Sequence, residues 1–186
     1  MFLCNGYLEL PNVYGLIADE KNGVCDCVKL LSEKGHKNVA FLVNHYTPSN
    51  RLKQAGFEEG VARYCGNASP VVIETGDTVD DVYRATQRLM RERPETNGII
   101  YAEDLLAVVG LRALSEMGVS VPEDVSVIGI NNSAYSLICT PTLTSLDNML
   151  YDLSLTAARD IFDVLKGQRI NKKMMIYSRI VERQST

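Results

Sequence analysis

The sequence contains no cluster of lysine and arginine residues anywhere along its 186 positions. Its formal net charge is −4 at pH 7, and its pI is about 5.2. Binding to duplex DNA requires a clustered cationic face that displaces counterions from the phosphates. We therefore expect that this chain does not bind nucleic acid by itself.

No apolar run reaches membrane-spanning length, and no charged-then-apolar leader precedes the first predicted strand. The cysteines are odd in number and lack the spacing of a disulfide framework or a zinc site: Cys4, Cys25, Cys27, Cys65 and Cys139. Cys25 and Cys27 lie two positions apart on a predicted helix, so we expect one in the core and the other partly exposed. These absences favour a cytoplasmic protein with reduced thiols, no metal site and no membrane partner.

Signatures of catalysis are missing as well. Neither a glycine-rich phosphate loop nor a Gly-x-Ser-x-Gly nucleophile elbow is present. The two histidines, His36 and His45, are expected in a surface turn and in a solvent-facing loop. Three carboxylate pairs open predicted helices, where the helix dipole favours negative charge by a few tenths to about 1 kcal/mol: Asp19–Glu20, Asp80–Asp81 and Glu103–Asp104. We predict that the chain is not an enzyme and uses no cofactor.

What the sequence does contain is an alternation of short apolar runs and helical patterns. The runs recur roughly every 30 residues, the length of a βα unit. They are residues 39–43, 71–73, 98–101 and 125–130. Nearly uninterrupted apolar strands are buried on both faces, so the pattern predicts an α/β fold with a parallel sheet flanked by helices.

Several helix ends are marked by local signals. Thr47 precedes Pro48 as an N-cap, and Thr78 with Asp81 has the spacing of a capping box. Gly35 and Gly118 are expected to end two helices in the left-handed conformation.

Both ends of the chain depart from this rhythm. Residues 1–4 and 13–17 read as strands without upstream helices to cover them. Residues 143–146 form a short extended run, followed by a helix over 150–165 and a last strand over 174–181. These pieces look like parts of a lobe whose first half is absent.

Polar side chains follow the predicted strands at their carboxyl ends, where open α/β sheets bind ligands. They lie at residues 5–7, 44–53, 75–78, 103–104 and 131–132. A crevice lined by amides, hydroxyls and a few charges suits a polyhydroxylated ligand.

Five segments resemble motifs of the LacI/GalR family of bacterial transcription regulators, in the family's order. They are residues 30–40 around Gly35–His36, Arg51 to Phe57, residues 118–129 around Pro122, residues 141–145, and the terminal Arg183–Thr186. The resemblance covers nearly the whole chain.

The resemblance implies a periplasmic-binding-protein-like effector domain that holds its ligand between two lobes. Residues 1–20 would end the N-terminal lobe, 21–142 would form the C-terminal lobe, 143–168 would return to the N-terminal lobe, and 169–186 would close the C-terminal lobe. The family's helix-turn-helix head and hinge helix have no counterpart here, so operator DNA would be bound only through a head outside this sequence. The resemblance also implies a homodimer, for which the helix over residues 51–64 is one possible surface.

The resemblance further implies ligand-binding positions. Lys53 stands where the family has a sugar-contacting arginine, and a lysine cannot form the bidentate fork of an arginine. Glu103 replaces an asparagine, Asn131 replaces an aspartate, and Thr78 replaces an aromatic residue that often stacks on the sugar. The candidate ligand-binding residues are Asn5, Tyr46, Ser49, Lys53, Thr78, Glu103, Asn131 and Asn148.

We therefore interpret the chain as the sugar-like effector-sensing domain of a LacI-type regulator of carbohydrate genes. A solute-binding protein for sugar import shares the fold, but it would require an export signal or a lipid-anchor cysteine. A small α/β enzyme is a third possibility, for which the sequence offers no nucleophile–base pair.

Overall fold

The apolar runs of the sequence form the centre of a six-stranded sheet in the computed structural model, which describes residues 1–186. Its strand order is β4-β3-β5-β6-β7-β9, and every pairing is parallel except the antiparallel pair β7–β9. The strands are β3 (Val39–Val43), β4 (Val71–Glu74), β5 (Gly98–Tyr101), β6 (Ser126–Ile130), β7 (Thr144–Asp147) and β9 (Arg179–Val181). Because β3, β5 and β6 are buried along their whole length, they can consist almost entirely of apolar residues.

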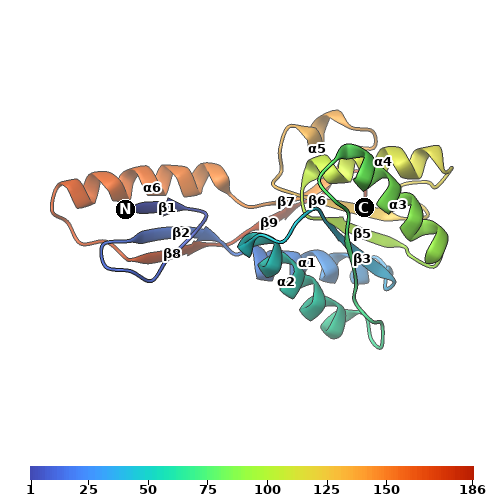
Figure 1. Cartoon of the computed structure of the whole chain (residues 1–186), viewed down its shortest axis with the longest axis horizontal. Coiled ribbons are helices and arrows are strands. Elements are labelled where there is room, and N and C mark those ends of the chain that lie inside the picture. The colour runs from blue at the N-terminus through green and yellow to red at the C-terminus, as the bar shows by residue number, and fades with distance from the viewer.

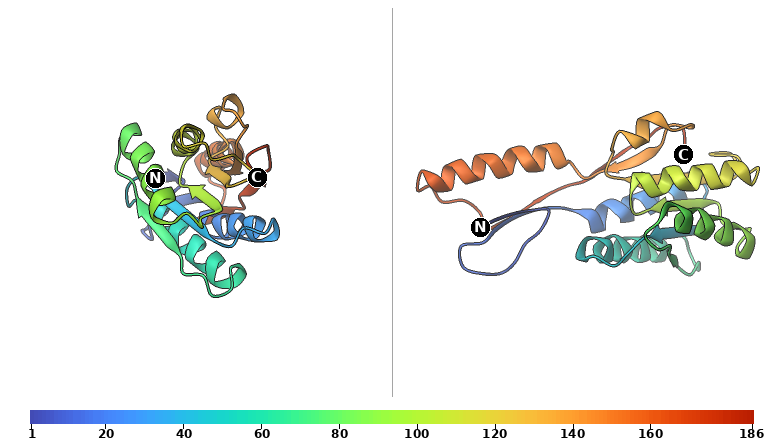
Figure 2. Two further views of the ribbon diagram at one scale, coloured as in Figure 1. Left: turned by 90° about the vertical axis from the view of Figure 1, so that its right-hand side faces the viewer. Right: turned by 45° about the horizontal axis from the view of Figure 1, so that its top comes forward.

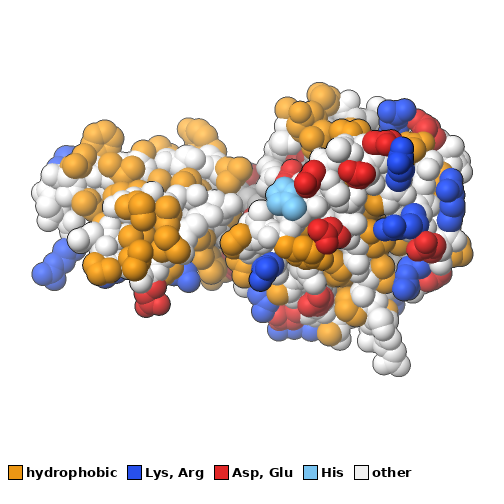
Figure 3. Space-filling view, viewed as in Figure 1, with side chains coloured by type: hydrophobic (Ala, Val, Ile, Leu, Met, Phe, Trp, Pro, Cys, Tyr) orange, Lys and Arg blue, Asp and Glu red, His pale blue; other side chains and the backbone are white.

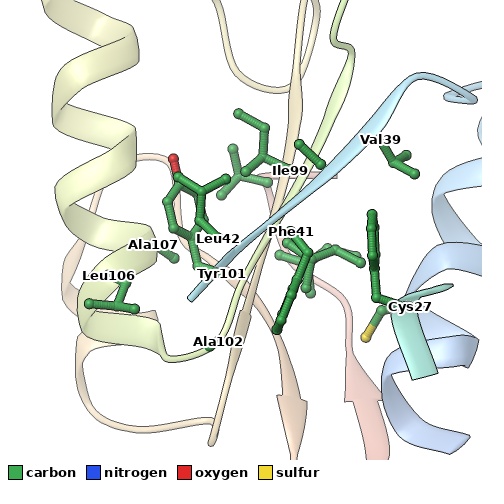
Figure 4. Close-up of a cluster of buried hydrophobic side chains, with 14 of the residues drawn as sticks. Cys27, Val39, Phe41, Leu42, Ile99, Tyr101, Ala102, Leu106 and Ala107 are labelled. Carbon is green, nitrogen blue, oxygen red and sulfur yellow. The ribbon is translucent and has the colours of Figure 1, made fainter. Parts of the chain in front are cut away.

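Helices cover both faces of this sheet, which together with them forms the larger lobe (Figures 1 and 2). The helices are α1 (Glu20–Glu33), α2 (Pro48–Tyr64), α3 (Val79–Glu92), α4 (Asp104–Glu116) and the short α5 (Tyr135–Ile138). Helix α1 packs against α2, and α3 packs against α4. Figure 4 shows the sheet side chains enclosed between α4 and α1. The predicted parallel sheet flanked by helices is confirmed.

The larger lobe has one continuous core of 30 buried residues. Phe41 of β3 and Phe57 of α2 are fully buried and stack with their ring centroids 5.6 Å apart. Tyr101 of β5 is also fully buried, and its hydroxyl lies 2.9 Å from the hydroxyl of Thr86 on α3. The side chains of both sheet faces therefore belong to the same packed interior.

The predicted helix ends are confirmed. The Thr47 hydroxyl accepts a hydrogen bond from the Asn50 amide, and Thr78 and Asp81 form a reciprocal capping box. Gly35 has φ +92° and Gly118 has φ +74°, as expected for residues that end helices in the left-handed region.

A second, three-stranded sheet forms the smaller lobe, at the left of Figure 1. Its parallel strands β1 (Phe2–Cys4), β2 (Tyr14–Ala18) and β8 (Lys173–Ile176) lie in the order β1-β2-β8. Helix α6 (Leu150–Leu165) covers one face of the sheet and has the predicted bounds. Three residues form the buried core of this lobe: Leu16, Ala18 and Leu153.

The late part of the chain is divided between the lobes differently from the prediction. The single strand expected over 174–181 is two strands: β8 pairs with β2 in the smaller sheet, whereas β9 pairs with β7 in the larger one. Residues 144–147, expected in the returning segment, pair with β6 of the larger sheet as β7. The chain therefore crosses between the lobes three times, after β2, after β7 and between β8 and β9 (Figure 1).

Two local predictions were wrong. Cys25 is buried along with Cys27, because α2 covers the side of α1 on which Cys25 lies. The pKa of the Cys25 thiol is raised by burial, and the charged side chains of Arg63 and Glu59 on α2 are close enough to influence it. His36 is half-buried rather than a surface residue, and its Nε2 lies 3.0 Å from the Ser126 hydroxyl.

No helix in the structure combines the length and the apolar character that crossing a membrane requires.

Candidate functional site

Polar side chains from the three crossings and from the carboxyl ends of the larger sheet meet between the lobes. Glu20, directly after the first crossing, is only 4% exposed. Its Oε1 atom accepts hydrogen bonds from the Ser49 hydroxyl at 2.8 Å and from Asn148 Nδ2 at 3.4 Å. The same oxygen lies 3.7 Å from the Lys53 ammonium, which makes a buried ion pair. Glu20 thus connects the first crossing to α2 and to the end of β7.

Lys53 is held in place by α2 and the end of β5. Its Nζ donates to Asn50 Oδ1 at 3.2 Å and to the carbonyl oxygen of Ala102 at 3.1 Å. Asn50 is itself fixed, because its Nδ2 donates to the carbonyl oxygen of His45 at 2.7 Å. A buried ammonium needs such partners, since an unpaired buried charge is strongly destabilising.

Asn148 extends the same set of contacts to the other two crossings. Its Nδ2 also donates to Asn131 Oδ1 at 3.2 Å, and its Oδ1 accepts from the Ser178 hydroxyl at 3.0 Å. Ser178 lies between β8 and β9, and Asn148 lies between β7 and α6. We call these connected side chains the junction network: Glu20, Ser49, Asn50, Lys53, Asn131, Asn148 and Ser178. The network contacts every segment that joins the lobes.

The loop that carries Asn131 is fixed by Asp104 at the start of α4. The Asp104 carboxylate accepts from the Ser133 amide at 2.6 Å and from the hydroxyls of Ser133 at 2.8 Å and Ser145 at 2.6 Å. Burial raises the pKa of Asp104, and the hydrogen bonds from Ser145 and Ser133 oppose that rise. A Cβ atom on Gly129 would clash with Asp104 Oδ1 and with the Leu143 side chain, so only glycine fits there. Asp104 therefore positions the loop after β6.

Glu103, next to Asp104, has a different environment. It is half-exposed and occupies the N-cap position of α4, but its side chain makes no capping hydrogen bond. Both carboxylate oxygens are thus free to accept hydrogen bonds from a ligand. The adjacent Ala102 carbonyl is bound by Lys53, so Glu103 lies beside the junction network.

The structure brings together four of the eight sequence-predicted residues, namely Ser49, Lys53, Asn131 and Asn148, in the junction network. Asn5 lies in the smaller lobe, where its Oδ1 accepts from the Ala18 amide at 3.3 Å, close to the first crossing.

The other two predicted residues lie outside these contacts. Tyr46 is 45% exposed, and the exposed Thr78 is engaged in the capping box of α3. The loops that carry them are linked by His45, whose Nδ1 lies 3.1 Å from Asp77 Oδ1. His45 is exposed, as its sequence context suggested.

Sequence reasoning missed Glu20, Asn50 and Ser178. The pair Asp19–Glu20 was interpreted only as a helix-opening pair, and Asp19 does accept the capping hydrogen bond from the Asn22 amide. One carboxylate is enough for that task. Because Asp19 alone caps α1, the second carboxylate so soon after the end of β2 is the sequence signal that Glu20 has a different binding partner.

Comparison with known proteins gives the family. Residues 28–186 match the model of the periplasmic binding protein-like domain. An HTH-type transcriptional regulator of Lachnoclostridium phytofermentans is 28% identical over 187 residues, covering 100% of this chain and 56% of that protein. Catabolite control protein A of Priestia megaterium is 27% identical over 186 residues, covering 96% of this chain and 54% of its own length. The chain thus spans about half the length of the curated relatives it matches.

Solved structures agree with the fold. A LacI transcriptional regulator from a Rhodococcus species superposes with a TM-score of 0.90 at 23% identity, covering 100% of this chain and 69% of that one. A LacI family transcriptional regulator from an Arthrobacter species, in complex with lactose, gives a TM-score of 0.83 at 25% identity. The match covers 97% of this chain and 68% of that one. Its curated relatives include transcriptional regulators, and the chain belongs to the periplasmic binding protein-like domain family.

Proposed function

We propose that this chain is the effector-sensing domain of a cytoplasmic LacI-type transcription regulator that controls carbohydrate genes, with a sugar-like molecule as its effector. The observation that carries the proposal is the junction network, which joins the polar carboxyl edge of the larger sheet to all three crossings. The structures of similar regulators in complex with lactose and with cellobiose support a sugar ligand. Operator DNA would be bound through a head domain outside these residues, and the domain itself would catalyse no reaction.

A ligand between the lobes would bind to groups from both of them. The free carboxylate of Glu103 and the side chains of Asn131 and Ser49 come from the larger lobe, and Asn5 comes from the smaller one. Tyr46 and Thr78 would lie at the rim, while Lys53 and Asn148 would form the wall behind. Sugar hydroxyls both donate and accept hydrogen bonds, so such a mixed set of partners can satisfy them.

A bound ligand could regulate the protein through the segments that join the two lobes. Displacing a hydrogen bond of Asn131 or Ser49 changes the partners of Asn148 and Glu20, which lie at two crossings. A ligand shifts the equilibrium between two lobe orientations only by the difference in its affinity for them. The effector would therefore act by favouring one orientation.

We further propose that two copies associate through an apolar surface on the larger lobe formed by α3, α4 and α5. Large hydrophobic side chains are exposed there: Val79 57%, Leu105 39%, Tyr135 46%, Leu137 61% and Ile138 75%. Figure 3 shows hydrophobic side chains gathered over α5. The helix over residues 51–64 suits this role less, because it packs on α1 and exposes Leu52 as its one large hydrophobic residue. Leu137→Asp should turn a dimer into a monomer in sedimentation velocity, and an unchanged sedimentation coefficient would contradict this surface.

Ligand-dependent thermal unfolding tests the effector. Pentoses, hexoses, lactose and cellobiose would be screened, and a sugar present at about 100 times its Kd should stabilise the native state by about 2.7 kcal/mol. Glu103→Ala should weaken binding of that sugar about ten-fold or more, without loss of stability, because the side chain has no partner in the protein. The exposed Glu123→Ala serves as control with the same change of charge. Equal affinity in both variants would contradict the proposed site.

A further inference from the structure

We propose that the effector carries no negative charge, and that Glu20 determines this selectivity by neutralising Lys53. The inference rests on the proposed function and adds a chemical class to it. A lysine at the edge of a ligand site suggests a phosphate or a carboxylate on the ligand, and the surroundings of this lysine oppose that reading.

The Lys53 ammonium donates two hydrogen bonds within the protein and forms an ion pair with Glu20 that is longer than a hydrogen bond. An ammonium group has three N–H donors, and three oxygens surround this one: Asn50 Oδ1 at 3.2 Å, the Ala102 carbonyl at 3.1 Å and Glu20 Oε1 at 3.7 Å. The Lys53 side chain is 5% exposed and the Glu20 side chain 4%. The two charges therefore form a buried, neutral unit.

The group of this ion pair that can still bind a ligand is the Glu20 carboxylate, a hydrogen-bond acceptor. Its hydrogen bonds from Ser49 and Asn148 both go to Oε1. No fully buried side-chain oxygen in the structure lacks a hydrogen-bond partner. Oε2 has no partner in the protein, so this oxygen is not completely enclosed. A carboxylate oxygen in that position accepts hydrogen bonds from hydroxyl groups and repels an anionic group.

The other charged groups at this edge have the same effect. The Glu103 carboxylate has no capping partner, and Asp77 is 78% exposed beside His45. Asp147 lies 3.6 Å from Arg179 and forms an ion pair with it. Glu103 is thus a free acceptor at this edge, and placing like charges next to each other penalises an anionic ligand. Neutral polyols, which bring many O–H donors, match this set.

Matched ligand pairs test the selectivity of the natural sequence. Glucose, ribose and cellobiose would each be compared by calorimetry with their phosphate esters, and glucose also with gluconate. We expect the neutral member of the pair that binds to bind at least about ten-fold more tightly than its anionic counterpart, since close like charges cost several kcal/mol. An anionic member that binds as tightly as its neutral counterpart would overturn the inference.

A second experiment addresses the ion pair without knowledge of the effector. Glu20→Ala removes the neutralising charge and opens space beside Lys53, so inorganic phosphate at constant ionic strength should raise the Tm of this variant and leave the natural sequence unchanged. Glu123→Ala, with the same change of charge at an exposed position, should show no such gain, and Glu20→Ala combined with Lys53→Gln should lose it. A Glu20→Ala protein that folds but does not respond to phosphate would refute the role of Glu20.

If Glu20→Ala does not fold, Lys53→Gln provides the mirror test. It leaves the Glu20 carboxylate uncompensated, so glucosamine should bind more tightly than glucose by about ten-fold. Equal affinities would refute the inference. If phosphate raises the Tm of the Glu20→Ala variant but no sugar binds to the natural sequence, the ion-pair assignment stands and the proposed function is rejected.

Discussion

The two lobes are built from the same elements but differ greatly in what they bury. The larger lobe has six strands covered on both faces and a core of 30 residues. The smaller lobe has three strands covered by one helix and a core of three residues. Hydrophobic burial is the dominant favourable contribution to folding, so the larger lobe stabilises itself, whereas the smaller lobe draws little stability from its own contacts.

The exposed surfaces show the same difference. On α6, three large side chains lie mostly in solvent: Tyr151 79%, Phe162 63% and Leu165 76%. Tyr177, after β8, is 78% exposed. Figure 3 shows hydrophobic side chains spread over the smaller lobe. A parallel sheet normally has both faces covered, so this lobe presents a surface that is fit for further packing.

The largest effect should come from the core of the larger lobe. Phe41→Ala removes a fully buried ring that stacks on Phe57 and should destabilise the protein by about 3–5 kcal/mol. Phe162→Ala makes the same chemical change at an exposed site and should alter stability by less than about 0.5 kcal/mol. Urea unfolding followed by circular dichroism measures the free energy of unfolding of both variants. An equal decrease in the two would contradict the difference between the lobes.

A change in the smaller core should remain local. Leu153→Ala removes one of the three buried residues of that lobe and should cost about 2 kcal/mol, the lower end for such a change, because little structure surrounds the site. Hydrogen exchange should show faster exchange in β1, β2 and β8 with unchanged protection in β3, β5 and β6. If β3 and β5 also lost protection, the lobes would unfold as one unit.

Helix capping gives a smaller contrast between the lobes. Thr78→Ala breaks the capping box of α3 and should cost about 1 kcal/mol. The N-cap residue of α6 is instead Met149, which has φ +53° and makes no side-chain capping bond. Because asparagine tolerates that conformation and can cap a helix, Met149→Asn should stabilise the protein by up to about 1 kcal/mol. Thermal unfolding measures both changes, and a destabilising Met149→Asn would contradict the assignment.

The smallest effect concerns His36 in the larger lobe. Burial, followed by the charge of Lys34, lowers its pKa from the ordinary value of 6.5. The unfolded chain therefore binds the proton more tightly, and the contribution of His36 to stability is complete above pH 6.5 and declines as the pH falls through the lowered pKa. His36→Gln should flatten the dependence of the free energy of unfolding on pH in that window. An unchanged slope would show that His36 does not couple to folding.

Local sequence signals predicted those features that depend on neighbouring residues. Thr47, Thr78, Gly35 and Gly118 mark helix ends because a cap or a left-handed residue acts within one turn of the helix. The helix expected over residues 150–165 is α6, with the same bounds.

The candidate site was only partly predictable, because its contacts join distant positions. Ser49, Lys53, Asn131 and Asn148 were expected at this edge, and the structure connects them through hydrogen bonds. Glu20 was not expected there, and it lies 128 positions from Asn148. No local pattern reports a contact across such a separation.

The sequence alone predicted the alternating strands and helices of the larger lobe, the family resemblance and the polar character of the sheet edge. These properties depend on residue type and short-range spacing. Only the tertiary structure decided that β8 and β9 separate into different sheets, that α2 buries Cys25, and that Lys53 pairs with Glu20. Each of these outcomes depends on which surfaces pack together. Burial removes water, so a buried charge must be paired with a group of the protein.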